Sequence, residues 1–188
     1  MKIAAAVLMA ALVVAMPGFA APARKAPPPP SPERAARAFY AAYLKIHPSG
    51  IPSARERSRL RELVSDRLYA LLEQGERAEQ RYAVATRHES PPLVEWDIFS
   101  SLFEGLTAFS LGACMVQDET MASCIANLTY SSPGEADTRW SDTVLLVKVG
   151  RRYRVDDIAF GGTWAFANKG RSSEIVTDAI SESQKPAN

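Results

Sequence analysis

Two adjacent segments with the composition of β-strands lie near the C-terminal end of the sequence, on either side of Gly150. They belong to the stretch 139–166, which is rich in β-branched and aromatic residues and carries a Gly-Gly break before Trp164. Such residues favour strands, and a glycine between two strand segments predicts a tight turn. The stretch therefore predicts a β-hairpin, and it places the acidic pair Asp156-Asp157 inside an otherwise apolar strand.

The register of this hairpin decides which aspartate faces the core. A three-residue loop, 150–152, keeps apolar residues opposite one another and pairs Leu145 with Asp157. A two-residue loop would pair Val147 with Arg154, which mixes an apolar and a charged group. We therefore predict the three-residue loop, which places Asp157 on the apolar face of its strand.

The N-terminal half carries helix signals. Ser31-Pro32 provides a cap and a suitable first helical residue, and the apolar face that follows ends at 47–50. A capping box at 53–56 begins a second helical region. Gly75 and the charged residues after it predict a frayed or bent continuation of that region.

The hydrophobic period changes to two after this region, which is typical of strands. We predict a helix or tail for the weak pattern at 170–183. The predicted strands cover about 106–117, 121–131, 141–149 and 152–160. Helices followed by a run of adjacent strands predict an α+β fold, with N-terminal helices packed on a curved antiparallel sheet.

The first residues have the pattern of an export signal. A basic start, an apolar run and a small-residue exit predict a signal peptide at 1–20, cleaved after Ala20, and hence a periplasmic protein. An uncleaved membrane anchor is the alternative, although the run is shorter than the ~20 residues that span a bilayer. We expect a Pro-rich linker at 21–30, one α+β domain at 31–168 and a weak helix or tail at 169–188.

The charge balance excludes a bulk attraction to nucleic acid. Loss of Lys2 with the signal peptide leaves 21 basic against 21 acidic residues. No second long apolar run follows, so we expect no stable membrane insertion after cleavage. The arginine run 55–61 is interleaved with glutamates and predicts a solvated face, with contact to an anionic surface as the alternative.

The two cysteines, Cys114 and Cys124, lie at equal distances from the centre of a predicted hairpin. Such positions are cross-strand partners, and an even cysteine count in an exported protein favours a bridge. We predict a disulfide; two reduced thiols are the alternative.

Several short blocks resemble a family of uncharacterised bacterial exported proteins and lipoproteins, whose fold is similar to the cone-shaped, cystatin-like fold of nuclear transport factor two. The blocks are 39–44, 50–53, 63–68, 95–105, 140–142, 155–158 and 162–164. The family usually has glycine where Trp96 stands, and this chain lacks the lipid-bearing cysteine of some relatives. The resemblance implies a curved sheet that closes on helices and leaves a cavity at one end. It supplies no catalytic residues, and such cones host enzymes, ligand binders and interaction modules alike.

Asp157 is the first candidate for chemistry. A poorly solvated carboxylate has a raised pKa, which suits a general base, and isomerases of the ketosteroid type use such a group with a tyrosine donor, a role open to Tyr130 or Tyr153. The alternative is a structural aspartate held by hydrogen bonds near the cone mouth. Asp97 has the same two interpretations, the structural one being a helix cap.

The aromatic residues offer candidate ligand contacts. Trp96, Trp140 and Trp164, with the two tyrosines, would stack on a ligand or pack in the core. We place Trp164 at the rim, because the glycines before it permit a sharp turn.

Recognised metal, nucleophile and phosphate-binding motifs are missing from the sequence, so we expect no metal and no cofactor. We therefore predict a non-catalytic module that binds a small molecule or a periplasmic protein near Trp164 and Asp157. The alternatives are a small cofactor-free isomerase or hydratase with Asp157 as base, and an inhibitor or immunity-type protein. The sequence leaves the oligomeric state open.

Overall fold

The computed structural model describes residues 30–185. The predicted signal peptide and nearly all of the predicted linker lie outside these residues. The helices are α1 (Pro32–Ile46), α2 (Ala54–Leu60), α3 (Asp66–Ala85) and α4 (Ser172–Glu182), and the strands are β1 (Ala108–Val116), β2 (Met121–Tyr130), β3 (Thr138–Val149) and β4 (Arg152–Ala159). The strands form one antiparallel sheet in the order β1-β2-β3-β4, which confirms the predicted α+β class.

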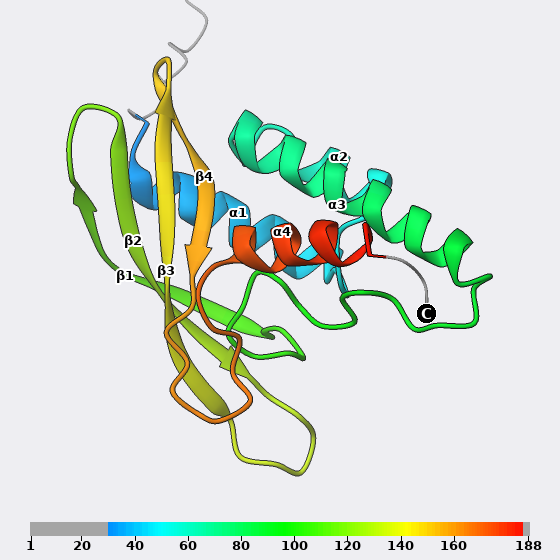
Figure 1. Cartoon of the computed structure of the whole chain (residues 1–188). Coiled ribbons are helices and arrows are strands. Elements are labelled where there is room, and N and C mark those ends of the chain that lie inside the picture. The colour runs from blue at the N-terminus through cyan, green and yellow to red at the C-terminus, as the bar shows by residue number, and fades with distance from the viewer. Residues whose placement is uncertain (1–29, 186–188) are drawn as a thin grey trace, which may run out of the picture.

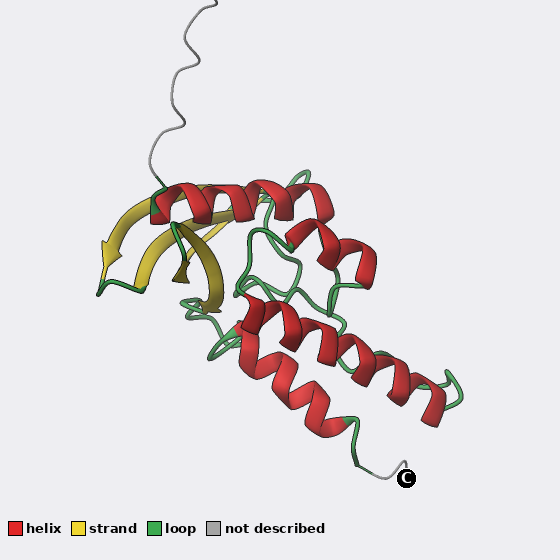
Figure 2. Cartoon of the chain, turned by 90° about the horizontal axis from the view of Figure 1, so that it is seen from above, coloured by secondary structure: helices red, strands yellow, loops and turns green. Residues whose placement is uncertain are grey.

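The sheet is curved, and the helices divide between its face and its edge. Helix α1 crosses behind the strands, whereas α3 and α4 lie together beyond β4 (Figures 1 and 2). The β4 edge is extended by single bridges, from Val64 to Val155 and from Arg171 to Ala159. These bridges attach the segments before α3 and α4 to the sheet.

Serine caps begin the first three helices, the first two of them where the sequence predicts caps. The side chains of Ser31, Ser53 and Ser65 each accept a hydrogen bond from a backbone amide of the first turn. Glu56 completes the capping box of α2 by accepting from the Ser53 amide. Each cap satisfies a donor that has no partner within its helix.

The prediction of a bend at Gly75 is wrong, because α3 runs unbroken through this residue. A Cβ atom on Gly75 would lie 2.7 Å from the Val176 side chain and 3.0 Å from that of Ile51. Glycine here permits the close approach of α4 to α3, so its role is packing rather than helix termination.

The predicted three-residue hairpin loop is also wrong. The loop is one residue shorter, and Val147 lies opposite Arg154. The charge of Arg154 is neutralised away from Val147, because its guanidinium forms ion pairs with Glu62 at 3.2 Å and with Asp66 at 3.3 Å. A partner from outside the hairpin thus permits the register that local pairing disfavours.

A β-bulge nevertheless restores the predicted pairing of Leu145 with Asp157. The register shifts between Leu145 and Leu146, so Asp156 is an extra residue of β4. A bulge redirects the side chains that follow it. Asp157 consequently points to buried surroundings, as predicted.

The cross-strand disulfide between Cys114 and Cys124 is present, which confirms the prediction. It joins β1 to β2, where the two cysteines are register partners. A bridge of this loop length stabilises chiefly by restricting the unfolded chain.

We expect replacement of both cysteines by alanine to lower the free energy of unfolding by about 2–3 kcal/mol. Urea titration of the oxidised wild type, the reduced wild type and the double variant measures this loss. The reduced wild type is the control, since it should match the variant. Equal stability of all three would contradict a stabilising role for the bridge.

Candidate functional site

Among residues 30–185, three aspartates lie buried, each at most 3% exposed: Asp97, Asp142 and Asp157. A buried carboxylate is costly unless donors surround it. The donors around each aspartate therefore show whether it serves the fold or is free to meet a ligand.

Asp157 is held by the first turn of α4. Its Oδ1 accepts hydrogen bonds from the amides of Ile158 (2.9 Å) and Ser173 (3.1 Å), and its Oδ2 accepts from the Ser173 hydroxyl (2.5 Å). The Arg67 guanidinium lies 3.7 Å from Oδ2. Both oxygens are thus engaged, which favours the structural interpretation of Asp157 over the general base.

Asp142 is the centre of a second group of hydrogen bonds, the Asp142 cluster, formed with Ser101, Trp140, Gly161 and Gly162. Its Oδ2 accepts from the Ser101 amide (2.9 Å) and the Trp140 indole (3.0 Å), and its Oδ1 accepts from the Gly161 amide (2.9 Å) and the Ser101 hydroxyl. The Ser101 hydroxyl in turn accepts from the Gly162 amide at 2.9 Å. The cluster ties two loops to β3.

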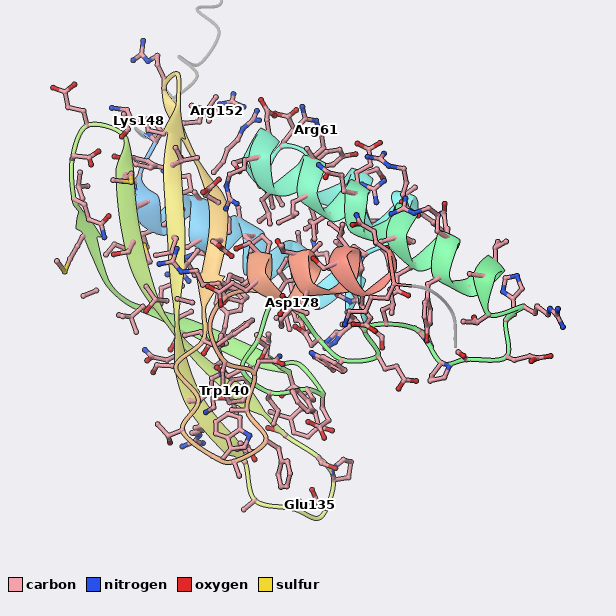
Figure 3. The ribbon with its side chains drawn as sticks, in the orientation of Figure 1. Arg61, Glu135, Trp140, Lys148, Arg152 and Asp178 are labelled. Atoms are coloured by element: carbon pink, nitrogen blue, oxygen red, sulfur yellow. A yellow bond between two sulfur atoms is a disulfide. The ribbon has the colours of Figure 1, made fainter. Side chains whose placement is uncertain are left out.

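Trp164 packs beside this cluster rather than standing free at a rim. It is half-buried and meets Trp140 edge-on, with ring centroids 6.0 Å apart. Figure 3 places Trp140 among the loops at the end of the sheet opposite Lys148. The exposed aromatic residue of this loop is Phe166, which is 80% exposed.

The two candidate tyrosines lie at opposite ends of the sheet. Tyr130 ends β2, next to the loop that carries Glu135, whereas Tyr153 pairs with Lys148 beside the β3–β4 turn (Figure 3). They therefore do not form one site with each other.

Asp97 differs from the other two aspartates because only two donors reach its carboxyl group. The Tyr43 hydroxyl donates to Oδ2, and the Phe99 amide donates to Oδ1 at 2.6 Å. The Leu106 amide donates to the Tyr43 hydroxyl at 3.4 Å. A Cβ on Gly105 would lie 2.2 Å from that hydroxyl, so glycine is needed for the close approach. Asp97 thus caps a tight turn through the Phe99 amide.

Burial is the main cause of an unusual titration at this pair. It raises the pKa of Asp97 to about 7, with a smaller rise from the charge of Asp142, while the bonds from Tyr43 and Phe99 oppose the shift. Burial also raises the pKa of Tyr43, and the neighbouring Asp97 adds to that rise. Tyr43 therefore remains a hydrogen-bond donor at neutral pH.

A pocket of about 380 Å³ opens beside Asp97. We term it the acidic pocket, and its lining residues are His47, Pro48, Ser49, Glu95, Trp96, Asp97, Phe103 and Glu104. Three carboxyl groups and no lysine or arginine occur among these described residues. Trp96 and Phe103 stack with ring centroids 5.3 Å apart and form its aromatic side.

A second pocket of about 590 Å³ adjoins the first, since both are lined by Ser49 and Glu95. Its other walls come from Ile51, α3 and the segment 88–94. A third, of about 500 Å³, lies over the strands and includes Trp140. Of the predicted site residues, Asp97 lines the first pocket and Trp140 the third, whereas Asp157 lines none of these three.

The space between α1 and the sheet is filled by side chains. Phe39, Tyr40, Tyr43 and Phe99 are each at most 1% exposed, and their rings meet mostly edge-on. Aromatic packing of this kind occupies the volume that an internal ligand would need.

Two residues of this region escaped the sequence-based prediction. Tyr43 lies on the apolar face of α1, yet a buried tyrosine hydroxyl requires a partner, and that requirement points to a nearby carboxylate. Asp142 alternates with the buried residues Trp140 and Val144 along β3. A carboxylate on the buried face of a strand is a signal that could have identified it.

Comparison with protein-family models, curated proteins and solved structures found no match. The resemblance to the exported-protein family therefore stays a prediction. Among residues 30–185, no cluster of His, Cys, Asp and Glu is arranged to hold a metal ion. Within the same range, no helix is both long and apolar enough to cross a membrane.

Proposed function

We propose that this protein is a non-catalytic binding module, exported to the periplasm, that takes a small cationic ligand in the acidic pocket. The observation that carries the proposal is the composition of the pocket wall, which combines the exposed carboxylates of Glu95 and Glu104 with stacked aromatic rings. Carboxylates attract a cation, and an aromatic face adds a favourable cation–π contact. Protonated amines and the basic side chains of peptides have the matching chemistry.

Export is part of the proposal and rests on the predicted signal peptide and on the disulfide. Disulfides persist in oxidising compartments such as the periplasm. We further propose the cone-shaped fold of nuclear transport factor two, which the curved sheet and the crossing α1 support. In this cone the ligand would bind in the acidic pocket on the outer surface, because aromatic side chains fill the interior.

The geometry at the two candidate bases favours binding over catalysis. Asp157 has both oxygens engaged, so an isomerase or hydratase would have to use Asp97, whose raised pKa and tyrosine donor suit a general base. Asp97 is only 3% exposed, and both of its oxygens already accept hydrogen bonds. We therefore assign it to the fold of the pocket wall.

We expect at least one of putrescine, arginine and choline to bind, with glutarate as the anionic control. Replacing both Glu95 and Glu104 with glutamine should weaken binding roughly tenfold, because each exposed carboxylate contributes up to about 1 kcal/mol. Isothermal titration calorimetry measures the affinity. Change of Trp96 fluorescence on titration provides a second readout, since this residue lines the pocket.

The matched control replaces Glu89 and Glu135 with glutamine, since both are exposed carboxylates outside the pocket. It carries the same change in net charge and should bind as the wild type does. Equal weakening in both double variants would contradict the pocket assignment. Native mass spectrometry of protein purified from periplasm separates the alternatives, because a retained protein rather than a small mass would favour an inhibitor.

A further inference from the structure

Strand β1 has the composition of a buried strand, but only Phe109, Leu111 and Cys114 pack, half-buried, against the core. Seven of its nine residues are apolar, and none is charged or proline. It is the one strand of the four with no buried residue. Met115 and Val116 are 65% and 61% exposed. Exposed apolar surface of this kind marks contact sites.

The same strand forms the open edge of the sheet. Its inner neighbour is β2, and among the described residues no strand or bridge extends its outer side. Figure 1 shows β1 at the margin of the sheet with no helix beyond it. The opposite edge, at β4, is occupied by the bridges to Val64 and Arg171.

Edge strands are normally protected from pairing by charged side chains, prolines or bulges. Strand β4 carries four charged residues, whereas β1 carries none. One bulge interrupts β1, between Leu111 and Cys114, and it leaves regular ladders on both sides. Backbone donors and acceptors for a further strand therefore remain along most of its length.

We propose that β1 pairs antiparallel with β1 of a second copy of this chain, which joins two four-stranded sheets across a two-fold axis. An antiparallel arrangement about such an axis places the strand against itself. The absence of charge on β1 removes the like-charge repulsion that self-pairing would otherwise meet. The Cys114–Cys124 bridge fixes β1 to β2, so little ordering cost accompanies pairing.

Sedimentation velocity across a wide range of protein concentrations tests the proposal. We expect the mature wild type to form a dimer. Met115→Lys should weaken it by about tenfold or more, because a lysine on an edge strand opposes its pairing with a further strand. Ser110→Lys, also at an exposed residue of β1, provides a second variant, and circular dichroism checks that both variants fold.

Ile125→Lys is the matched control, because Ile125 is an exposed apolar residue of β2, one strand inside the edge. It should leave the dimer intact. Hydrogen exchange provides the backbone readout, with the amides of 108–116 expected to gain protection as the dimer forms. A monomer at every concentration overturns the proposal. So does a dimer that Ile125→Lys dissociates while the β1 amides exchange freely, because the sheet face would then be the interface.

Discussion

Replacement of Asp142 with alanine is expected to lower the free energy of unfolding by roughly 4 kcal/mol, because the change leaves buried hydrogen-bond donors without an acceptor. Asp142 is 1% exposed and accepts hydrogen bonds from the backbone amides of Ser101 and Gly161 and from the Trp140 indole. An unpaired buried N–H group costs about 1–3 kcal/mol. The Ser101 amide and the Trp140 indole lose their acceptor at once, whereas the Gly161 amide keeps the Ser101 hydroxyl at 3.1 Å. A cavity adds to the loss.

Urea denaturation at neutral pH measures this effect, and Asp178→Ala is the matched control. Asp178 is an exposed aspartate on α4 (Figure 3), so its replacement should change stability by less than about 0.5 kcal/mol. Asp142→Asn should fall between the two, since one amide oxygen can still accept. A loss below about 1 kcal/mol for Asp142→Ala would contradict the assignment of Asp142 as the acceptor that holds these loops.

The elements of this fold follow from local patterns, which is why they could be predicted. Capping serines and apolar periodicity act within a few residues of where they stand, so helix starts at Ser31 and Ser53 and the four strands were predicted closely. The errors arose where a distant residue decides the outcome. The hairpin register at Arg154 is possible because the α2–α3 turn and the start of α3 supply carboxylates. The helix continues through Gly75 because α4 packs on it.

The candidate site was harder to predict, because its decisive contacts join residues far apart in the chain. Tyr43 and Asp97 are separated by 54 residues, and Ser101 and Asp142 by 41. Sequence spacing shows that a carboxylate is buried but not how many donors surround it. The number of donors is what separates Asp97 from Asp157, so the pocket beside Asp97 required the structure.

Stability should fall as the pH rises from about 4 to about 7, because Asp97 binds its proton more tightly in the folded than in the unfolded protein. Burial raises its folded-state pKa to about 7, whereas an unfolded aspartate titrates near about 3.9. Between these values the folded protein holds a proton that the unfolded chain has lost. The free energy of unfolding therefore declines by about 1.4 kcal/mol per pH unit, or roughly 4 kcal/mol in all.

The contribution of Asp97 is fully present below about pH 4 and constant again above about pH 7. Aspartates with lowered pKa values, such as Asp66 next to Arg61, act in the opposite direction and only in more acidic solution. Urea titrations of the wild type and Asp97→Asn across this window isolate the effect. The asparagine is neutral at every pH and can still accept from Tyr43, so the slope should disappear and the variant should be the more stable protein at pH 8, about one unit above the folded-state pKa. Parallel pH profiles for the two proteins would show that Asp97 is ionised in the fold, and its pocket wall would then carry a full third negative charge at neutral pH.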